Sequence, residues 1–175
     1  MKRALLSVLL LALATPALAQ APGETGGPIT NQAERDRVAE RVRGGVSCAG
    51  CDLFQINLAY EDVSRRDFSG ARLRQSDLTI AIADRADFSG ANLSLVNMFG
   101  VRASGANFNN ANLTGATLVG GHFGGARFAG AVFDNANLSG AELADAVGLT
   151  QAQLAQACGD NATTLPANLT LNPCR

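Results

Sequence analysis

A five-residue period runs without a gap from residue 51 to residue 145 and constrains the fold of this chain more than any other feature. Typical units are ADFSG at 86–90, ANLSL at 91–95 and ANLTG at 111–115. Every fifth residue from 53 to 143 is Leu, Phe, Val, Met or Ala. A period of five fits neither the 3.6-residue period of an α-helix nor the two-residue period of a strand. The sequence therefore predicts a repeat architecture, which has to be considered before ordinary secondary structure.

Each position of the repeat has a composition that predicts its role. Ala is the commonest residue two positions before the centre, and Gly is the commonest two positions after it. If the central residue and the residue two before it both face inward, one has to be small where the other is large. Gly at the end of the unit suits a corner with positive φ, and the Asp or Asn before the centre is expected to face outward and hydrogen-bond to nearby backbone.

This pattern resembles the pentapeptide-repeat family, whose consensus is Ala, then Asp or Asn, then Leu or Phe, then two variable residues that are often Ser and Gly. The resemblance implies an all-β fold, namely a right-handed quadrilateral β-helix with one pentapeptide on each side and four in each coil. At roughly 4.8 Å between coils, such a solenoid would be about 23 Å long. Residues 20 apart should then stack on one another.

The sequence contains the columns that this stacking predicts. The three regular core columns are Phe68, Phe88, Phe108 and Phe128; Leu53, Leu73, Leu93, Leu113 and Phe133; and Leu58, Leu78, Met98, Leu118 and Leu138. The fourth column is irregular and consists of Val63, Ala83, Ala103, Phe123 and Leu143. Its two alanines predict a thin side unless Val101 and Phe99 fill the space. Ile82 and Val132 occupy outward positions on different sides, so no single apolar patch is predicted.

The N-terminus has the order of a secretory signal peptide. Lys2 and Arg3 precede an apolar run, which ends in small residues up to Ala19. We expect cleavage after Ala19, because the run is shorter than the roughly 17 residues that a membrane span needs. The predicted location is periplasmic or secreted, with no membrane span in the mature chain. Cleavage would leave 12 basic residues against 15 acidic ones, a small charge that says little about a partner.

Helices are predicted at both ends of the solenoid, because open ends would expose core and unpaired backbone. Asn31 and Glu34 have the spacing of a capping box and open an N-terminal helix, while Thr150 and Gln153 open a C-terminal one that Gly159 ends. The predicted organisation is signal peptide 1–19, disordered leader 20–30, N-terminal capping helix 31–45, pentapeptide-repeat β-helix 46–147, and C-terminal helix and cap 148–175.

Four cysteines in an exported chain predict disulfides. Cys48 and Cys51 lie at one end of the rod, and Cys158 and Cys174 at the other, which excludes pairing between ends. We expect a Cys158–Cys174 bridge. Cys48 and Cys51 leave two interpretations open, a second disulfide or two buried thiols. A redox CxxC motif would need a helix N-terminus, which this context does not supply.

No grouping of residues predicts catalysis, a cofactor or a metal. His122, the only histidine, occupies an outward position without partners for a catalytic triad or a zinc site. Glu61 and Arg66 occupy inward positions where small residues are the rule. Either they pair with each other in the first coil, or they mark a local distortion or a functional cleft.

The function predicted from these features is that of a non-catalytic exported scaffold or protein-interaction module. Its protein partner is not identified, and the protein could be a monomer or a dimer. The alternative is a DNA mimic, because some members of the family inhibit or protect type II topoisomerases. Arg72, Arg102 and Arg127 interrupt the acidic outward positions that a mimic would need, so no nucleic-acid-like role and no nucleic-acid partner are expected.

Overall fold

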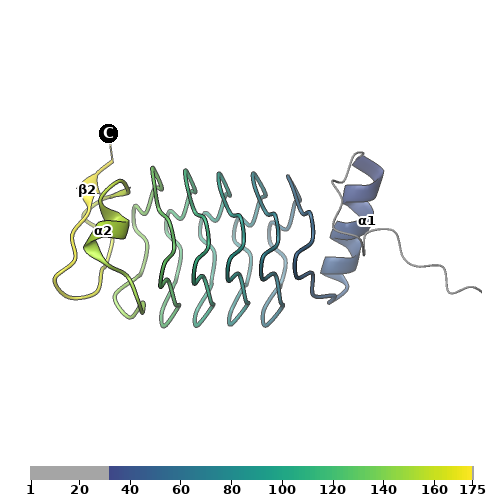
Figure 1. Cartoon of the computed structure of the whole chain (residues 1–175), viewed down its shortest axis with the longest axis horizontal. Helices are drawn as coiled ribbons and strands as arrows, with labels where there is room; N and C mark the ends of the chain where they lie inside the picture. The colour runs from purple at the N-terminus through teal and green to yellow at the C-terminus, as the bar shows by residue number, and fades with distance from the viewer. Residues whose placement is uncertain (1–31, 175) are drawn as a thin grey trace, which may run out of the picture.

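The computed structural model describes residues 32–174, which form a rod with one helix at its N-terminal end and a short helix and two short strands at its C-terminal end. Figure 1 shows the coils stacked along the long axis between these two ends. The predicted signal peptide 1–19, the predicted leader 20–30 and the predicted cap residue Asn31 lie outside the described residues.

Each side of the rod pairs with the next coil through one residue, the one before the centre of the repeat. Parallel bridges join residues 20 apart, from Asp52 with Arg72 through to Arg127 with Val147. Four repeats therefore make one coil. On each side, only one residue between two turns pairs with the next coil, so the coils contain isolated β-bridges rather than strands. Within residues 32–174, β1 and β2 are the only strands longer than one residue.

Corners between sides have one repeated geometry. The N–H of the first residue of each repeat donates to the carbonyl three residues earlier, as from Ile56 to Leu53 at 3.1 Å. The residue just before that donor has a positive φ at each corner from Gly50 to Gly140, whether it is Gly70 at 64° or Ile80 at 55°. This is the conformation that a type II turn needs at its third residue. Glycine adopts it without a clash, whereas a β-branched residue is strained there.

Outward Asp and Asn side chains brace the corners, as their position in the repeat predicts. The Asp67 carboxylate accepts a hydrogen bond from the N–H of Ser69 at 2.8 Å, and the Asn137 side chain accepts one from the N–H of Ser139 at 2.9 Å. Each is a side-chain mimic of a turn, which explains why the repeat favours these two short residues.

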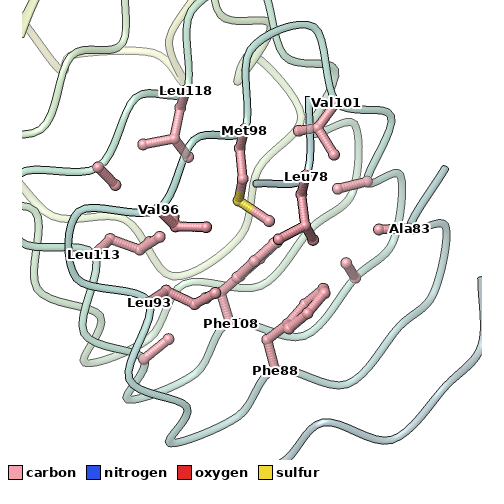
Figure 2. Packing of buried hydrophobic residues seen from close by; sticks show 14 of the residues in the cluster. Leu78, Ala83, Phe88, Leu93, Val96, Met98, Val101, Phe108, Leu113 and Leu118 are labelled. Atoms are coloured by element: carbon pink, nitrogen blue, oxygen red, sulfur yellow. The ribbon is translucent and has the colours of Figure 1, made fainter. Parts of the chain in front are cut away.

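The core lies along the axis of the rod, and the predicted columns line it. All central residues from Leu53 to Leu143 are buried. Phe88 and Phe108 stack with ring centroids 5.1 Å apart and planes 10° apart, and Figure 2 shows them beside the leucines of neighbouring sides. The prediction for the irregular column was half right, since Val101 is buried but Phe99 is 48% exposed. Phe99 sits at the first position of a corner, which points outward.

Helix α1, Gln32–Arg43, lies at the N-terminal end with Val38, Ala39 and Val42 buried. The N–H of Val46 donates to the carbonyl of Arg41 at 3.1 Å, and Gly45 has a φ of 99°. This is the Schellman arrangement that ends many helices on a glycine.

The C-terminal end differs from the sequence prediction. Helix α2, Gln151–Leu154, opens with a capping box in which Thr150 and Gln153 bond reciprocally. The helix does not continue to Gly159; strand β1, Cys158–Gly159, pairs in parallel with strand β2, Asn172–Pro173. Cys158 also pairs with Asn137, so the bridge ladder of the coils continues past the last repeat. That pairing ends the helix early, because a strand has to lie flat on the preceding coil.

Candidate functional site

The four cysteines lie as two bonded pairs at opposite ends of the rod. The Sγ atoms of Cys48 and Cys51 are 2.13 Å apart, with Cα atoms at 5.3 Å. Those of Cys158 and Cys174 are 1.96 Å apart, with Cα atoms at 4.8 Å. Neither pair leaves a free thiol.

Glu61 and Arg66 do not pair with each other, contrary to one of the two sequence interpretations. The Glu61 carboxylate binds Nε of Arg43, at the end of α1, at 2.9 Å. The Arg66 side chain turns back over its corner, and its Nη2 donates to the carbonyl of Asp62 at 2.8 Å.

Both residues line a cleft of about 810 Å³ on the side of the rod that carries the irregular column. The cleft spans three coils and is closed at one end by α1. Its lining consists almost wholly of charged and hydroxyl side chains: Arg43, Glu61, Asp62, Ser64, Arg65, Arg66, Asp84, Arg85, Arg102 and Ser104. The alternative interpretation of Glu61 and Arg66, that they mark a cleft, therefore agrees with where the structure places them.

Arginines outnumber carboxylates in this cleft by five to three. Asp84 pairs with Nε of Arg102 at 2.8 Å, in addition to the pair between Glu61 and the helix. The pKa of Asp62 is lowered, first by hydrogen bonds from the side chain and the N–H of Ser64, and further by the charges of Arg66 and Arg102. Asp62 is thus anionic near neutral pH, and the excess of arginines gives the cleft a cationic character.

Three arginines of the cleft, Arg65, Arg66 and Arg85, have no carboxylate partner among residues 32–174. Arg65 and Arg85 occupy the same corner in successive coils, and no ion pair or side-chain hydrogen bond of the described chain involves either. Nη1 of Arg66 is buried without a hydrogen-bond partner. A buried N–H of a charged group without an acceptor is costly, so the cleft is chemically suited to an anionic oxygen.

Other polar side chains of the rod pair with residues in the next coil. Nδ1 of His122 lies 2.8 Å from the carboxylate of Glu142, a partner that the sequence analysis missed although the two residues are 20 apart. No cluster of three or more metal-binding side chains occurs within the described residues. None of the helices described is long and apolar enough to cross a bilayer.

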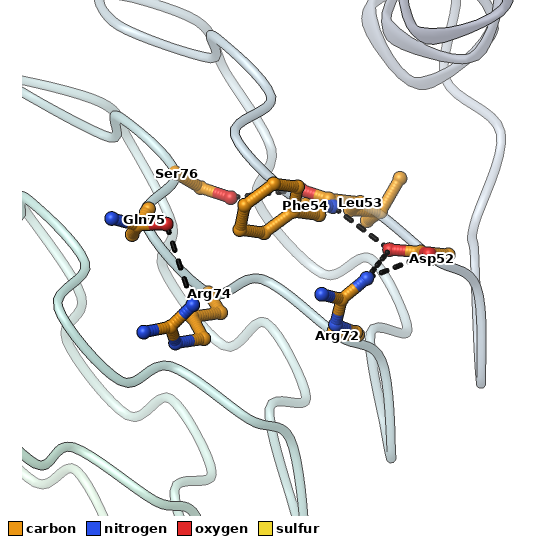
Figure 3. Close-up of polar contacts among 7 residues, drawn as sticks. All are labelled: Asp52, Leu53, Phe54, Arg72, Arg74, Gln75 and Ser76. Carbon is orange, nitrogen blue, oxygen red and sulfur yellow. Dashed lines mark hydrogen bonds and ion pairs between the residues drawn. The ribbon is translucent and has the colours of Figure 1, made fainter. Parts of the chain in front are cut away.

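Arg72 is an outward arginine that is neutralised by an aspartate of the neighbouring coil. Its Nη1 contacts both carboxylate oxygens of Asp52 at 3.0 and 2.9 Å, and its guanidinium lies 4.6 Å from the ring centre of Phe54 (Figure 3). With Arg102 also paired to an aspartate, acidic positions on these sides do not form the unopposed array that imitates a duplex.

Three solved structures of repeat proteins are similar to this chain. A pentapeptide repeat protein from the Arabidopsis thaliana thylakoid lumen is 32% identical, and the match covers 65% of this chain and 81% of that one, with a TM-score of 0.32. Rfr23 from the cyanobacterium Cyanothece 51142 is 28% identical over 66% of this chain and 72% of its own, with a TM-score of 0.23. A trypsin-treated variant of QnrB1, a plasmid-mediated fluoroquinolone resistance protein, is 22% identical over 58% and 63%, with a TM-score of 0.25.

No curated protein matches the chain. The family model for pentapeptide repeats matches in eight copies, at residues 64–98, 91–128, 111–147 and 122–158. Together these matches span more than half of the chain, and proteins of this family fold as right-handed β-helices. The chain therefore belongs to the pentapeptide repeat family.

Proposed function

We propose that this protein is a non-catalytic module for protein interaction that works outside the cytoplasm, after removal of a signal peptide at Ala19. The observation that carries the location is the pairing of all four cysteines, since disulfides persist in oxidising compartments and are rare in the cytosol. The charged, apolar and small-residue order of the first 19 residues supports the same location.

Rigid geometry supports the role of an interaction module. Each repeat is fixed to the next coil by backbone hydrogen bonds and to its own corner by a turn, so the four sides are pre-organised surfaces. In this proposal α1 and the segment after residue 148 cap the open ends. The buried residues Val42 and Leu154 of the two helices support that role.

The alternative function, imitation of DNA toward a topoisomerase, has less support. It requires a continuous negative surface, whereas Asp52 and Asp84 are each neutralised by an arginine and one side carries a cationic cleft. It also requires the cytoplasm, where the two cysteine pairs would be reduced.

The proposed location is tested by cell fractionation combined with mass spectrometry of the mature N-terminus and of alkylated thiols. We expect a chain that begins at Gln20, is recovered outside the cytoplasm, and has no alkylated cysteine before reduction. An uncleaved cytoplasmic chain with four alkylated cysteines would refute the proposal and would make topoisomerase inhibition the next assay.

A further inference from the structure

One side of the rod is built on Val63, Ala83 and Ala103 and is called the Val63 face below. It differs from the other three sides in the residues at the corners on either side of it. Each side of a coil carries three residues between two corners, so the corners that bound this face lie about 10 Å apart. One of them is apolar and the other cationic within the first coils. The cleft described above lies on this face and its cationic corner.

The apolar corner consists of Tyr60, Ile80 and Phe99, which are 73%, 47% and 48% exposed. Tyr60 and Ile80 occupy the same position in successive coils, about 4.8 Å apart, and Phe99 directly precedes Gly100, which holds that position in the third coil. Tyr60 and Ile80 hold φ values of 66° and 55° at the position where glycine is the unstrained choice. A strained backbone and large apolar side chains exposed to solvent both lower the stability of the fold. Their presence at these positions therefore suggests a functional role.

The cationic corner consists of Arg65 and Arg85, with φ values of 59° and 58°. The two residues are 20 apart and therefore neighbours in adjacent coils, and residues 32–174 supply no carboxylate to either. Like charges at adjacent positions repel, so a carboxylate placed between them would be stabilised by both. Arginine suits this task, because its planar guanidinium binds a carboxylate through two parallel hydrogen bonds.

Arg66 adds a third donor to the same site. It lines the cleft beside Arg65, and its buried Nη1 has no acceptor among the described residues. The guanidinium of Arg66 thus adds a third positive charge to the cleft. Three arginines in the first two coils thus converge on one anion-binding region, next to the apolar corner.

We propose that the Val63 face is the docking surface of this module and that it binds an acidic segment of a partner protein, with carboxylates on Arg65, Arg66 and Arg85 and apolar side chains on Tyr60, Ile80 and Phe99. The assignment rests on the proposed function and names its surface and its partner's chemistry. The apolar corner favours a peptide over a phosphate-rich ligand, because a nucleic-acid backbone would leave it uncovered. Tyrosine and arginine are also the residues that most often dominate protein interfaces.

The test uses fluorescence anisotropy with the purified, disulfide-bonded protein. The probe is a labelled peptide of about 12 residues in which Glu alternates with Leu; comparison peptides replace Glu by Lys, or Leu by Ser. We expect the Glu–Leu peptide to bind best and its affinity to fall as salt is raised. The double variant Arg65→Gln and Arg85→Gln should weaken binding about tenfold, and Ile80→Gly about fivefold.

Two matched variants control for charge and for exposed apolar surface elsewhere. Leu95→Gly removes a residue with the same 47% exposure as Ile80 and a φ of 58°, on another corner. Arg127→Gln removes an exposed arginine from another side. Neither should change the affinity by more than about twofold, and larger effects would overturn the assignment to the Val63 face.

Two further results would overturn the assignment. Equal binding of the Lys–Leu peptide would remove the role of the arginines. Displacement of the probe by citrate at equal carboxylate concentration, with no effect of Ile80→Gly, would identify a small-anion site and refute docking of a protein segment. The assay does not depend on where the cell keeps the protein, so a failed export experiment and a failed binding experiment are separate results.

Discussion

Replacement of Phe108 by alanine tests the stacked core most directly. Phe108 is fully buried in the middle of the rod, and its ring stacks on Phe88 at 5.1 Å and on Phe128 at 5.0 Å. The ring of Phe123 meets it edge-on at 6.0 Å. A Phe→Ala change in a core costs about 3–5 kcal/mol, and each aromatic pair adds about 0.5–1.5 kcal/mol to burial alone. With aromatic neighbours on three sides, we expect a loss near the top of the range, about 5 kcal/mol.

Phe68 provides the matched comparison. It is also fully buried but stacks on one ring only, that of Phe88 at 5.3 Å, because it lies in the first of the Phe coils. Phe68→Ala should therefore cost about 1–3 kcal/mol less than Phe108→Ala, since two aromatic pairs fewer are lost, one stacked and one edge-on.

Urea unfolding followed by circular dichroism measures both variants against the parent protein. The free energy of unfolding should fall with an unchanged slope if the rod unfolds as one unit. A lower slope for Phe108→Ala alone would mean that the two halves of the rod unfold separately, since repeats contact only their neighbours. A loss below about 2 kcal/mol, or a larger loss for Phe68→Ala, would refute the continuous aromatic stack.

Three further predictions concern the corners and the C-terminal end. Ile80→Gly should raise the free energy of unfolding by about 0.5–1 kcal/mol in urea titrations, because glycine adopts a φ of 55° without strain; a loss would show that the Ile side chain stabilises the rod. Replacing both Cys158 and Cys174 by serine should cost about 3 kcal/mol, as expected for a bridge between residues 16 apart, and a melting temperature equal to that of the parent would contradict it. The pKa of Asp160 is lowered chiefly by the N–H of Gly140, so its contribution is present above the ordinary pKa near 3.8 and is lost as pH falls through the lowered value; Asp160→Asn should flatten the acid limb of a stability–pH curve.

The coil geometry could be predicted from sequence because each repeat contacts only its neighbours. Phe68 and Phe88 are 20 residues apart in sequence and stacked in space, so the spacing of one column reveals the register of the rod. The outward position of the Asp and Asn side chains could be predicted for a similar reason, because the turn that each one stabilises lies within two residues of it.

The ends were harder to predict, because tertiary contacts decide them. The local sequence predicted that the C-terminal helix would end at Gly159. In the structure Cys158 pairs with Asn137, and Cys158–Gly159 form a strand instead. The ion pair between Arg43 and Glu61 depends on where α1 sits on the first coil, and no period in the sequence encodes that position. Glu61 was recognised as an exception to the small-residue rule, yet its partner lay outside the repeat.

The positions at the corners that are not glycine carry information that the count of glycines does not give. Nine glycines at the last position of the repeat predict positive φ there, and the same register forces Tyr60 and Arg65 into that conformation. From the third coil onward, the corresponding corners carry Gly100 and Gly105. Among the described residues, the non-glycine residues with a positive φ beside the Val63 face are therefore confined to the first two coils; Asp145, in the fifth coil, is not a glycine but does not have a positive φ.

Because these non-glycine corners lie in the first two coils, helix α1 is close to them as well as to the end of the core. Its last residue, Arg43, lines the cleft and is held there by Glu61 at 2.9 Å and by the carbonyl of Asn57 at 3.0 Å. The helix is thus one wall of the surface proposed to bind a partner, and the corners that flank this surface include Ile80, a β-branched residue with a φ of 55°. If stability alone governed these positions, glycine would serve in the first coils as well as it does in the third. The uneven distribution of large residues along two neighbouring corners is what a binding surface built at one end of a regular rod requires.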